Sequence, residues 1–250
     1  MKKRIFYILF FGGATVFFLY YLFPKDNIED YIGYQVFRVD PNLRLTIGDL
    51  GLHFPPYAKA RDTNIYYQQQ PLLSVSSARI RPGLATLFNR GTMAVFNGRA
   101  HKGRFNGKIT RGDASDRRSI AVSIDLAGIE LDDISGLKSI SGLSLSGQVA
   151  GNVHFIDDRP RPDQGSVDLV FTDCTFQLAK AIFDIKTVRF NRIEMKLDIQ
   201  DKTVSIRRLE MTGPQVNATF DGHIELRKPV IISRLNLIGK VRLHAEFTAG

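Results

Sequence analysis

Hydrophobic and polar residues alternate with a period of two over most of the chain after residue 42. The alternation is clear at residues 43–47, 120–126, 143–155 and 167–171. Such a period is typical of β-strands that present one face to an apolar environment. No stretch between these segments is long enough for repeated crossover helices, so the pattern predicts a mainly β protein with a mostly antiparallel, meandering sheet.

The clearest predicted hairpin lies at residues 193–206. Alternating apolar residues at 193–199 and 204–206 flank Asp201-Lys202, which is predicted to form the turn. The alternation changes phase before Leu209, which predicts a β-bulge near Arg207-Arg208. A closing strand is predicted to begin at Leu235 and to extend toward residue 247.

Three short motifs place an aromatic residue before a pair that favours turns: Phe96-Asn97-Gly98, Phe105-Asn106-Gly107 and Phe220-Asp221-Gly222. They predict repeated hairpins. Further glycines interrupt the long alternating segment at residues 143–155. Small residues inside a strand let a sheet bend, so we expect a curved sheet, either half-open as a groove or closed as a flattened barrel.

The N-terminus departs from this pattern, because the run from Ile5 to Phe23 holds no charged residue and follows Lys2, Lys3 and Arg4. A helix of this length would span about 28 Å, close to the thickness of a bilayer. The cations predict a cytoplasmic N-terminus and an exported remainder. The residues predicted to contact lipid include Ile5, Phe6, Leu9, Phe10, Val16, Phe17, Leu19, Leu22 and Phe23.

A cleaved signal peptide is the alternative interpretation of this run. Bulky residues at 20–24 stand where a signal peptidase needs small ones, and the apolar core exceeds about 15 residues. These features favour an uncleaved anchor, although Gly12-Gly13 leaves the alternative open.

A short amphipathic helix is predicted between the anchor and the sheet. Asp26 or Asn27 would cap it, and Ile28, Tyr31, Ile32 and Val36 would share one face. The predicted organisation is an anchor at 1–24, a juxtamembrane helix and linker at 25–42, and one β-rich domain at 43–250. A helical turn is also predicted at 83–88.

Composition narrows the classes of function. The formal net charge is +9, and subtracting Lys2, Lys3 and Arg4 leaves +6 on the exported part. On a tethered, exported domain this charge indicates anionic headgroups rather than nucleic acid. Cys174 is the only cysteine, so stability must come from burial and sheet hydrogen bonds.

The sequence holds no recognisable catalytic or metal-binding motif. Its five histidines are scattered singly, and Ser144 lacks the second glycine of a nucleophile elbow. The pairs Asp132-Asp133 and Asp157-Asp158 flank predicted turns. We therefore expect a protein that is not an enzyme and uses no cofactor or metal.

A set of framework segments along the chain resembles the type II secretion system protein N family (GspN). The matching segments are residues 22–24, 47–50, 54–56, 72–75, 79–82, 125–131, 145–151, 222–226 and 233–237. That family is in turn similar to AsmA and TamB-like proteins, whose curved sheets resemble open apolar grooves.

The resemblance implies a bacterial inner-membrane protein whose bulk lies in the periplasm. The function it implies is a non-enzymatic component of a type II secretion system that docks with other envelope proteins. The alternative is an AsmA/TamB-like protein that binds or conducts phospholipid along an apolar sheet face. The candidate residues of that face are Ile193, Met195, Leu197, Ile199, Val204 and Ile206.

Overall fold

The computed structural model describes residues 2–22, 24–53, 57–83, 92–111, 119–132, 144–157, 163–182, 185–227 and 232–244. Two helices precede the sheet: α1 (Lys2–Tyr21) and α2 (Lys25–Val39). The strands are β1 (Leu43–His53), β2 (Tyr57–Tyr67), β3 (Gln70–Pro82), β4 (Thr92–Ala100), β5 (Gly103–Arg111), β6 (Ile120–Glu130), β7 (Ser144–Asp157), β8 (Gln164–Ile182), β9 (Ile185–Gln200), β10 (Thr203–Thr212), β11 (Val216–Glu225) and β12 (Arg234–Leu243).

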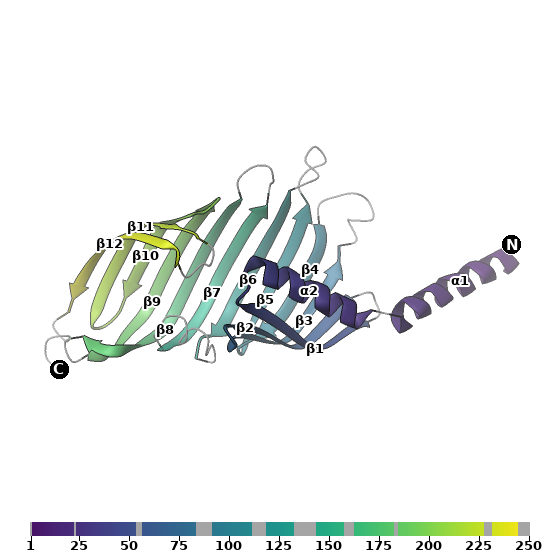
Figure 1. Ribbon diagram of the computed structural model, residues 1–250, viewed down its shortest axis with the longest axis horizontal. Coiled ribbons are helices and arrows are strands. Elements are labelled where there is room, and N and C mark those ends of the chain that lie inside the picture. Colours follow the sequence, from purple (N-terminus) through teal and green to yellow (C-terminus); the bar gives the residue numbers. More distant parts are fainter. Residues whose placement is uncertain are drawn as a thin grey trace.

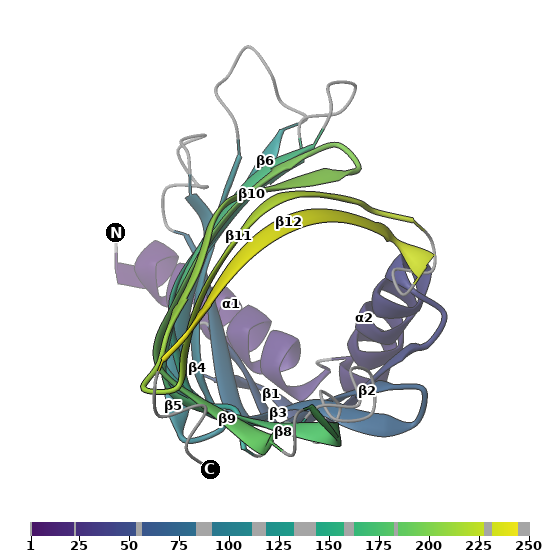
Figure 2. The same cartoon turned by 90° about the vertical axis from the view of Figure 1, so that its left-hand side faces the viewer.

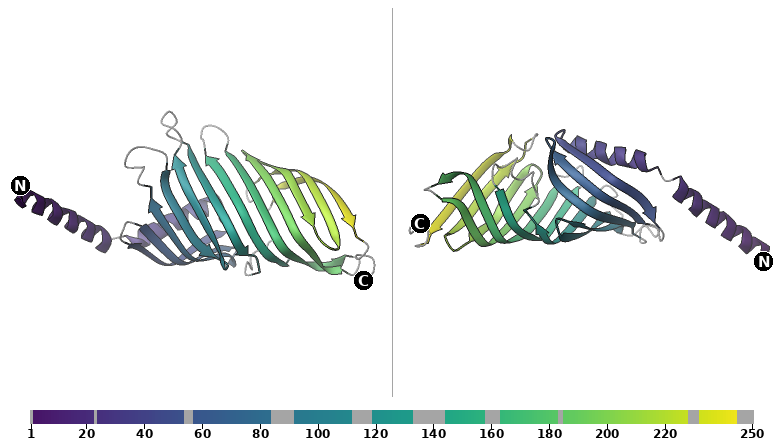
Figure 3. Two further views of the ribbon diagram at one scale, coloured as in Figure 1. Left: turned by 180° about the vertical axis from the view of Figure 1, so that it is seen from behind. Right: turned by 90° about the horizontal axis from the view of Figure 1, so that it is seen from below.

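All twelve strands form one sheet in which each strand pairs antiparallel with its neighbours in sequence, from β1 to β12 (Figure 1). The predicted mainly β, antiparallel meander is therefore confirmed. Among the described residues β1 and β12 do not pair, so the sheet is not closed. It is a single curved layer, seen from behind and from below in Figure 3.

Figure 2 shows how the layer curves, with β1 to β3 below and β12 arching above. The helix α2 lies at the open side of this curve and packs against β1. The accessible surface is 17693 Å². A compact protein of this mass exposes about 11,000 Å², so the shape is extended, as expected for one layer of sheet with α1 projecting from its end.

The helix α2 forms in the segment predicted for it, with two local differences. It begins directly after Pro24, and no side chain caps it, so the predicted caps Asp26 and Asn27 are wrong. Tyr31 was predicted on the packed face but is 64 % exposed. Ile28, Ile32 and Val36 are half-buried, as their spacing predicts. The helical turn predicted at 83–88 lies largely outside the described residues.

The N-terminal run is helical as α1, and its described aromatic side chains are exposed. Phe23 and the side chains of several other predicted anchor residues lie outside the described part. Within the described residues, no helix is both long enough and apolar enough to cross a bilayer. The structure thus does not show the transmembrane anchor that the sequence predicts.

The hairpin β9–β10 confirms the predicted turn at Asp201, which has a positive φ of 55°. Its register shifts between Ile206 and Arg208, where the bulge was predicted. The closing strand β12 begins at Arg234, one residue before the prediction. Residues 245–250, toward which it was predicted to extend, are outside the described part.

The Phe-Asn-Gly motifs are not turns, and this part of the prediction is wrong. Both lie inside strands, Phe96 opposite Gly107 and Gly98 opposite Phe105 across β4 and β5. Each ring covers the glycine of the other strand, and the two rings lie 6.4 Å apart. Because glycine has no Cβ, an aromatic ring can lie flat across the strand at that position. The turn itself falls at His101-Lys102, both with positive φ.

A similar contact involves the third motif, near the C-terminal end of the sheet. Phe220 lies inside β11, opposite Gly239 of β12. A Cβ at Gly239 would meet the Phe220 ring. The motif therefore indicates a cross-strand Phe–Gly contact rather than a chain reversal.

We expect Gly107→Ala to lower the free energy of unfolding by about 2 kcal/mol, the usual cost of overpacking. The new Cβ would overlap the Phe96 ring and lie 2.7 Å from the Ser123 carbonyl oxygen, which belongs to the backbone of β6 and cannot swing away. Urea unfolding of the purified chain measures the change.

Gly51→Ala is the matched control, because its Cβ would have His53 Nε2 at 3.7 Å as nearest neighbour. It is expected to leave the unfolding midpoint unchanged. Equal effects of the two substitutions would contradict the role assigned to the Phe–Gly contacts.

Candidate functional site

The strand register brings apolar residues from all twelve strands onto one face of the sheet. Residues directly opposite each other on paired strands point to the same side. Following the directly opposed residues from strand to strand gives three rows that run across the sheet without a polar residue. We call these rows together the apolar face.

The first row is Leu52, Ala58, Ile80, Phe96, Gly107, Ile124, Val153, Val167, Leu197, Ile206, Gly222 and Leu237. The second row is Leu50, Ala60, Ala78, Gly98, Phe105, Leu126, Gly151, Leu169, Met195, Leu209, Phe220 and Gly239. The third row crosses β3 to β12 through Pro82, Ala94, Ile109, Val122, Phe155, Gly165, Ile199, Val204, Ile224 and Leu235.

The apolar face has the dimensions of an extended ligand. Neighbouring strands are about 4.8 Å apart, so a row across twelve strands is about 53 Å long. The three rows are together about 13 Å wide, which gives a footprint of roughly 700 Å². Contiguous apolar patches beyond a few hundred Å² usually mark a contact with protein or lipid.

No second layer covers the centre of this face in the described structure. Val153, Val167 and Leu197, on the central strands β7 to β9, are only half-buried. In a two-layer domain such central side chains would be fully enclosed. Most of the buried apolar residues, among them Val149 and Ile193, form two small clusters on this same side of the sheet. Because no other layer supplies this burial, we infer that the apolar face is the concave one.

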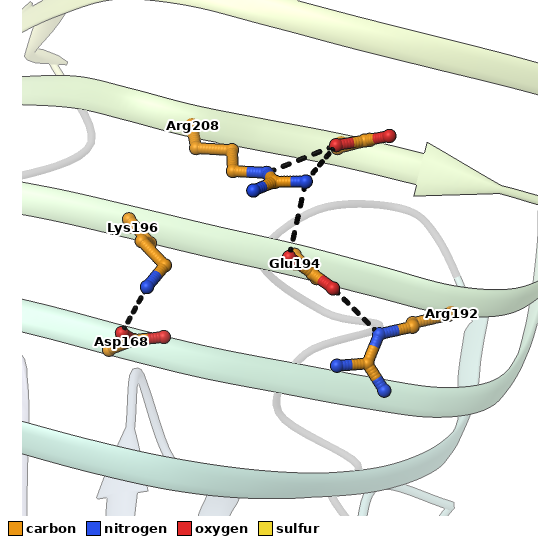
Figure 4. A network of polar contacts seen from close by, with 6 residues as sticks. Asp168, Arg192, Glu194, Lys196 and Arg208 are labelled. Carbon is orange, nitrogen blue, oxygen red and sulfur yellow. Dashed lines mark hydrogen bonds and ion pairs between the residues drawn. The ribbon is translucent and has the colours of Figure 1, made fainter.

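The opposite face is polar and carries ion pairs along β8, β9 and β10 (Figure 4). Lys196 Nζ lies 2.7 Å from an Asp168 carboxylate oxygen. Glu194 accepts a hydrogen bond from Arg192 Nε at 2.8 Å and has Arg208 at 3.5 Å. Since these groups are largely exposed, the pairs keep this face hydrated rather than hold the sheet together.

Two pKa shifts fit this division of the faces. The hydrogen bond from Arg192 and the nearby cations lower the pKa of the Glu194 carboxyl, which favours its ionised form. Within the buried cluster, the pKa of the Cys174 thiol is raised to about 11. Burial is the larger cause and the charge of Asp173 the smaller one. Cys174 is therefore a neutral, packed side chain at physiological pH and not a nucleophile.

The six residues predicted for the apolar face lie together on β9 and β10. Ile199 is opposite Val204, and Leu197 is opposite Ile206. Ile193, Val204 and Ile206 are buried, whereas the other three are half-buried. The prediction missed the greater part of the face, on β1 to β8 and β11 to β12, although alternation was recognised on several of these strands. Alternation within one strand does not tell which residues of different strands share a face, so the whole face could be traced only with the register.

Among the described residues, the histidines and the polar side chains beside them do not converge on one site. Ser123 Oγ is 2.9 Å from His154 Nδ1, and no described carboxylate completes a triad with them. His101 Nε2 accepts a hydrogen bond from the Ser74 backbone N–H, and His53 stacks on Tyr57. The described residues contain no group of three His, Cys, Asp or Glu side chains arranged to hold a metal ion.

One shallow cleft of about 460 Å³ lies on the polar side where β11 meets β12. His223, Glu225, Arg234, Leu235 and Asn236 line it. Its lining is mostly polar, so it suits neither an acyl chain nor a buried reaction centre.

Comparison with known proteins does not assign this chain to a class of protein. No protein family, curated protein or solved structure matches this chain. The candidate site is therefore defined by the geometry of the apolar face alone.

We expect Ile193→Ala to lower the free energy of unfolding by about 3 kcal/mol, since it removes a side chain that is 5 % exposed and packed in a core cluster. Glu194→Gln, one residue along on the polar face, is expected to leave the stability at neutral pH unchanged. Urea unfolding of both variants measures the contrast. A loss for Glu194→Gln equal to that of Ile193→Ala would contradict the assignment of the two faces.

Proposed function

We propose that this protein binds the acyl chains of phospholipids along its apolar face. The observation that carries the proposal is the unbroken set of apolar rows across the sheet, half-buried at the centre and without a second layer of described structure. Such a surface is costly to leave in water, so ligands of matching chemistry would cover it.

An acyl chain suits the face better than other apolar ligands. The rows are about 53 Å long and lack polar groups that could orient a compact ligand. A flexible hydrocarbon needs no hydrogen-bonding partner and can follow a curved strip. The excess of Lys and Arg over Asp and Glu, 34 against 25, favours anionic headgroups at the rim.

The N-terminal part supports a location at a membrane. On α2 the exposed side chains include Tyr31, Tyr34 and Phe37, and on α1 several phenylalanines are more than half exposed. Aromatic residues favour the interface between lipid and water. Anchoring through residues 5–23, with the rest of the chain in the periplasm, rests on the sequence.

The lipid proposal predicts that phospholipid accompanies the purified full chain, and mass spectrometry of a solvent extract measures it. Ile80→Asp is expected to reduce the bound lipid about tenfold, because an unpaired carboxylate would interrupt the first row. Ile80 is 42 % exposed, so the substitution should leave the fold intact.

Val95→Asp is the matched control. Val95 is 43 % exposed and lies on the neighbouring strand, opposite Arg81 on the polar face. It is expected to retain the lipid of the unsubstituted chain. Absence of phospholipid from the unsubstituted chain, or equal losses in both variants, would contradict lipid binding at the apolar face.

A second candidate function is docking in a type II secretion system, which the resemblance to GspN predicts. The observation that favours it is the free edge of the sheet at β12, whose ten residues are all exposed. An open strand edge can accept a strand from another protein.

The docking role predicts that the chain remains in the membrane pellet after an alkaline wash. It further predicts co-purification with an identified type II secretion component from detergent-solubilised membranes of a bacterium that contains both. Recovery of the chain without any such component would contradict this role and leave the lipid proposal standing.

A further inference from the structure

The strand β12 is an edge with unusually complete exposure. It is last in the sheet order, and within the described residues it pairs only with β11. Its large apolar side chains are well exposed, with Leu235 at 65 %, Ile238 at 74 % and Val241 at 59 %. The other edge differs, because α2 packs against β1.

The hydrogen-bonding pattern between β11 and β12 shows which backbone groups of β12 do not bond to β11. The His244 N–H donates to the Gln215 carbonyl, which makes residues 244 and 215 a hydrogen-bonded pair. Such pairs recur at every second residue of an antiparallel ladder. The register between β11 and β12 is constant. The backbone N–H and C=O groups of the even-numbered residues of β12 therefore point toward β11, and those of its odd-numbered residues point away.

A second bond confirms this phase from the other side of β11. The Leu226 N–H donates to the Lys202 carbonyl, so the even-numbered residues of β11 bond to β10 and the odd-numbered ones face β12. The outward peptide groups of β12 belong to Leu235, Leu237, Gly239, Val241 and Leu243. These are the residues that place β12 on the apolar face.

The even-numbered residues of β12 make its polar side positively charged. Lys240 and Arg242 lie opposite the uncharged Thr219 and Asn217. No described carboxylate forms an ion pair with either cation. The side of β12 that continues the polar face, residues 234, 236, 238, 240 and 242, contains no acidic residue.

We propose that β12 is a docking edge for an extended segment of a partner protein in which apolar residues alternate with acidic residues. This inference rests on the docking function proposed above and names the chemistry of the partner. The partner's backbone bonds to the outward peptide groups, its apolar side chains continue the apolar face, and its carboxylates lie beside Lys240 and Arg242.

Cations on an edge strand can also serve only to prevent aggregation. Short strands, prolines and bulges are other common ways in which an edge is protected. The strand β12 has ten residues, no proline and no register shift against β11, and it exposes Ile238 on its charged side. A second copy of this strand would offer cations and no acid, so the charge favours a different protein as the partner.

The probe is a fluorescent nine-residue peptide that alternates valine with glutamate, titrated against the full chain by anisotropy. The control peptide carries lysine in place of glutamate. We expect the glutamate peptide to bind about tenfold more tightly, as complementary charges favour it. Equal affinity for the two peptides, or no binding, would overturn the proposal.

Two variants test the site itself. Leu237→Pro removes an outward N–H that β11 does not use, and proline is tolerated on such an edge, so the fold is retained while peptide binding falls about tenfold. Leu237→Ala keeps the N–H and is expected to bind nearly as the unsubstituted chain does. Unchanged binding by Leu237→Pro would refute pairing at this edge.

The double substitution Lys240→Glu with Arg242→Glu is expected to reverse the preference toward the lysine peptide, which a misfolded protein could not do. Retention of the original preference would refute the charge argument. Since Leu237→Pro keeps an apolar side chain, its bound lipid should be unchanged. Loss of peptide binding and loss of lipid thus report on different functions.

Discussion

The whole structure depends on keeping apolar side chains on one side of a very wide sheet. A slip of one residue in any strand would turn its apolar residues to the polar face. The eleven consecutive strand pairings avoid this, even where the register shifts, as between Leu126 and Ile129 or between Ile206 and Leu209. The bulges and the apolar pattern of the sequence match, so the rows stay continuous across the shifts.

The curvature follows from the same rows. Glycines stand in them at positions such as 98, 107 and 151, where a Cβ would collide with a ring or a neighbouring backbone. Gly151 also has a φ of 146°, which other residues rarely adopt. Close packing on the apolar side of the sheet, with free space on the polar side, bends the layer. The same residues therefore supply the bend and the smooth apolar surface.

The two proposed functions use different parts of one architecture. Lipid binding uses the middle of the sheet, where no described segment covers the half-buried aliphatic side chains. Docking uses an end of the sheet, where backbone groups of β12 have no partner among the described residues. At β12 the two meet, because its odd-numbered residues combine free peptide groups with apolar side chains. A strand added there would lengthen the apolar face without disturbing its centre.

The sequence alone determined the class of fold, the hairpin at Asp201 and the bulge near Arg207, because period-two alternation and turn chemistry are local properties. It misassigned the Phe-Asn-Gly motifs, since a glycine that faces a ring across a strand looks the same in sequence as a glycine in a turn. It also pointed to only six residues of the apolar face, all on β9 and β10. The register, the single layer and the free edge at β12 were decided by tertiary structure, because they depend on which distant residues pair and on what fails to cover them.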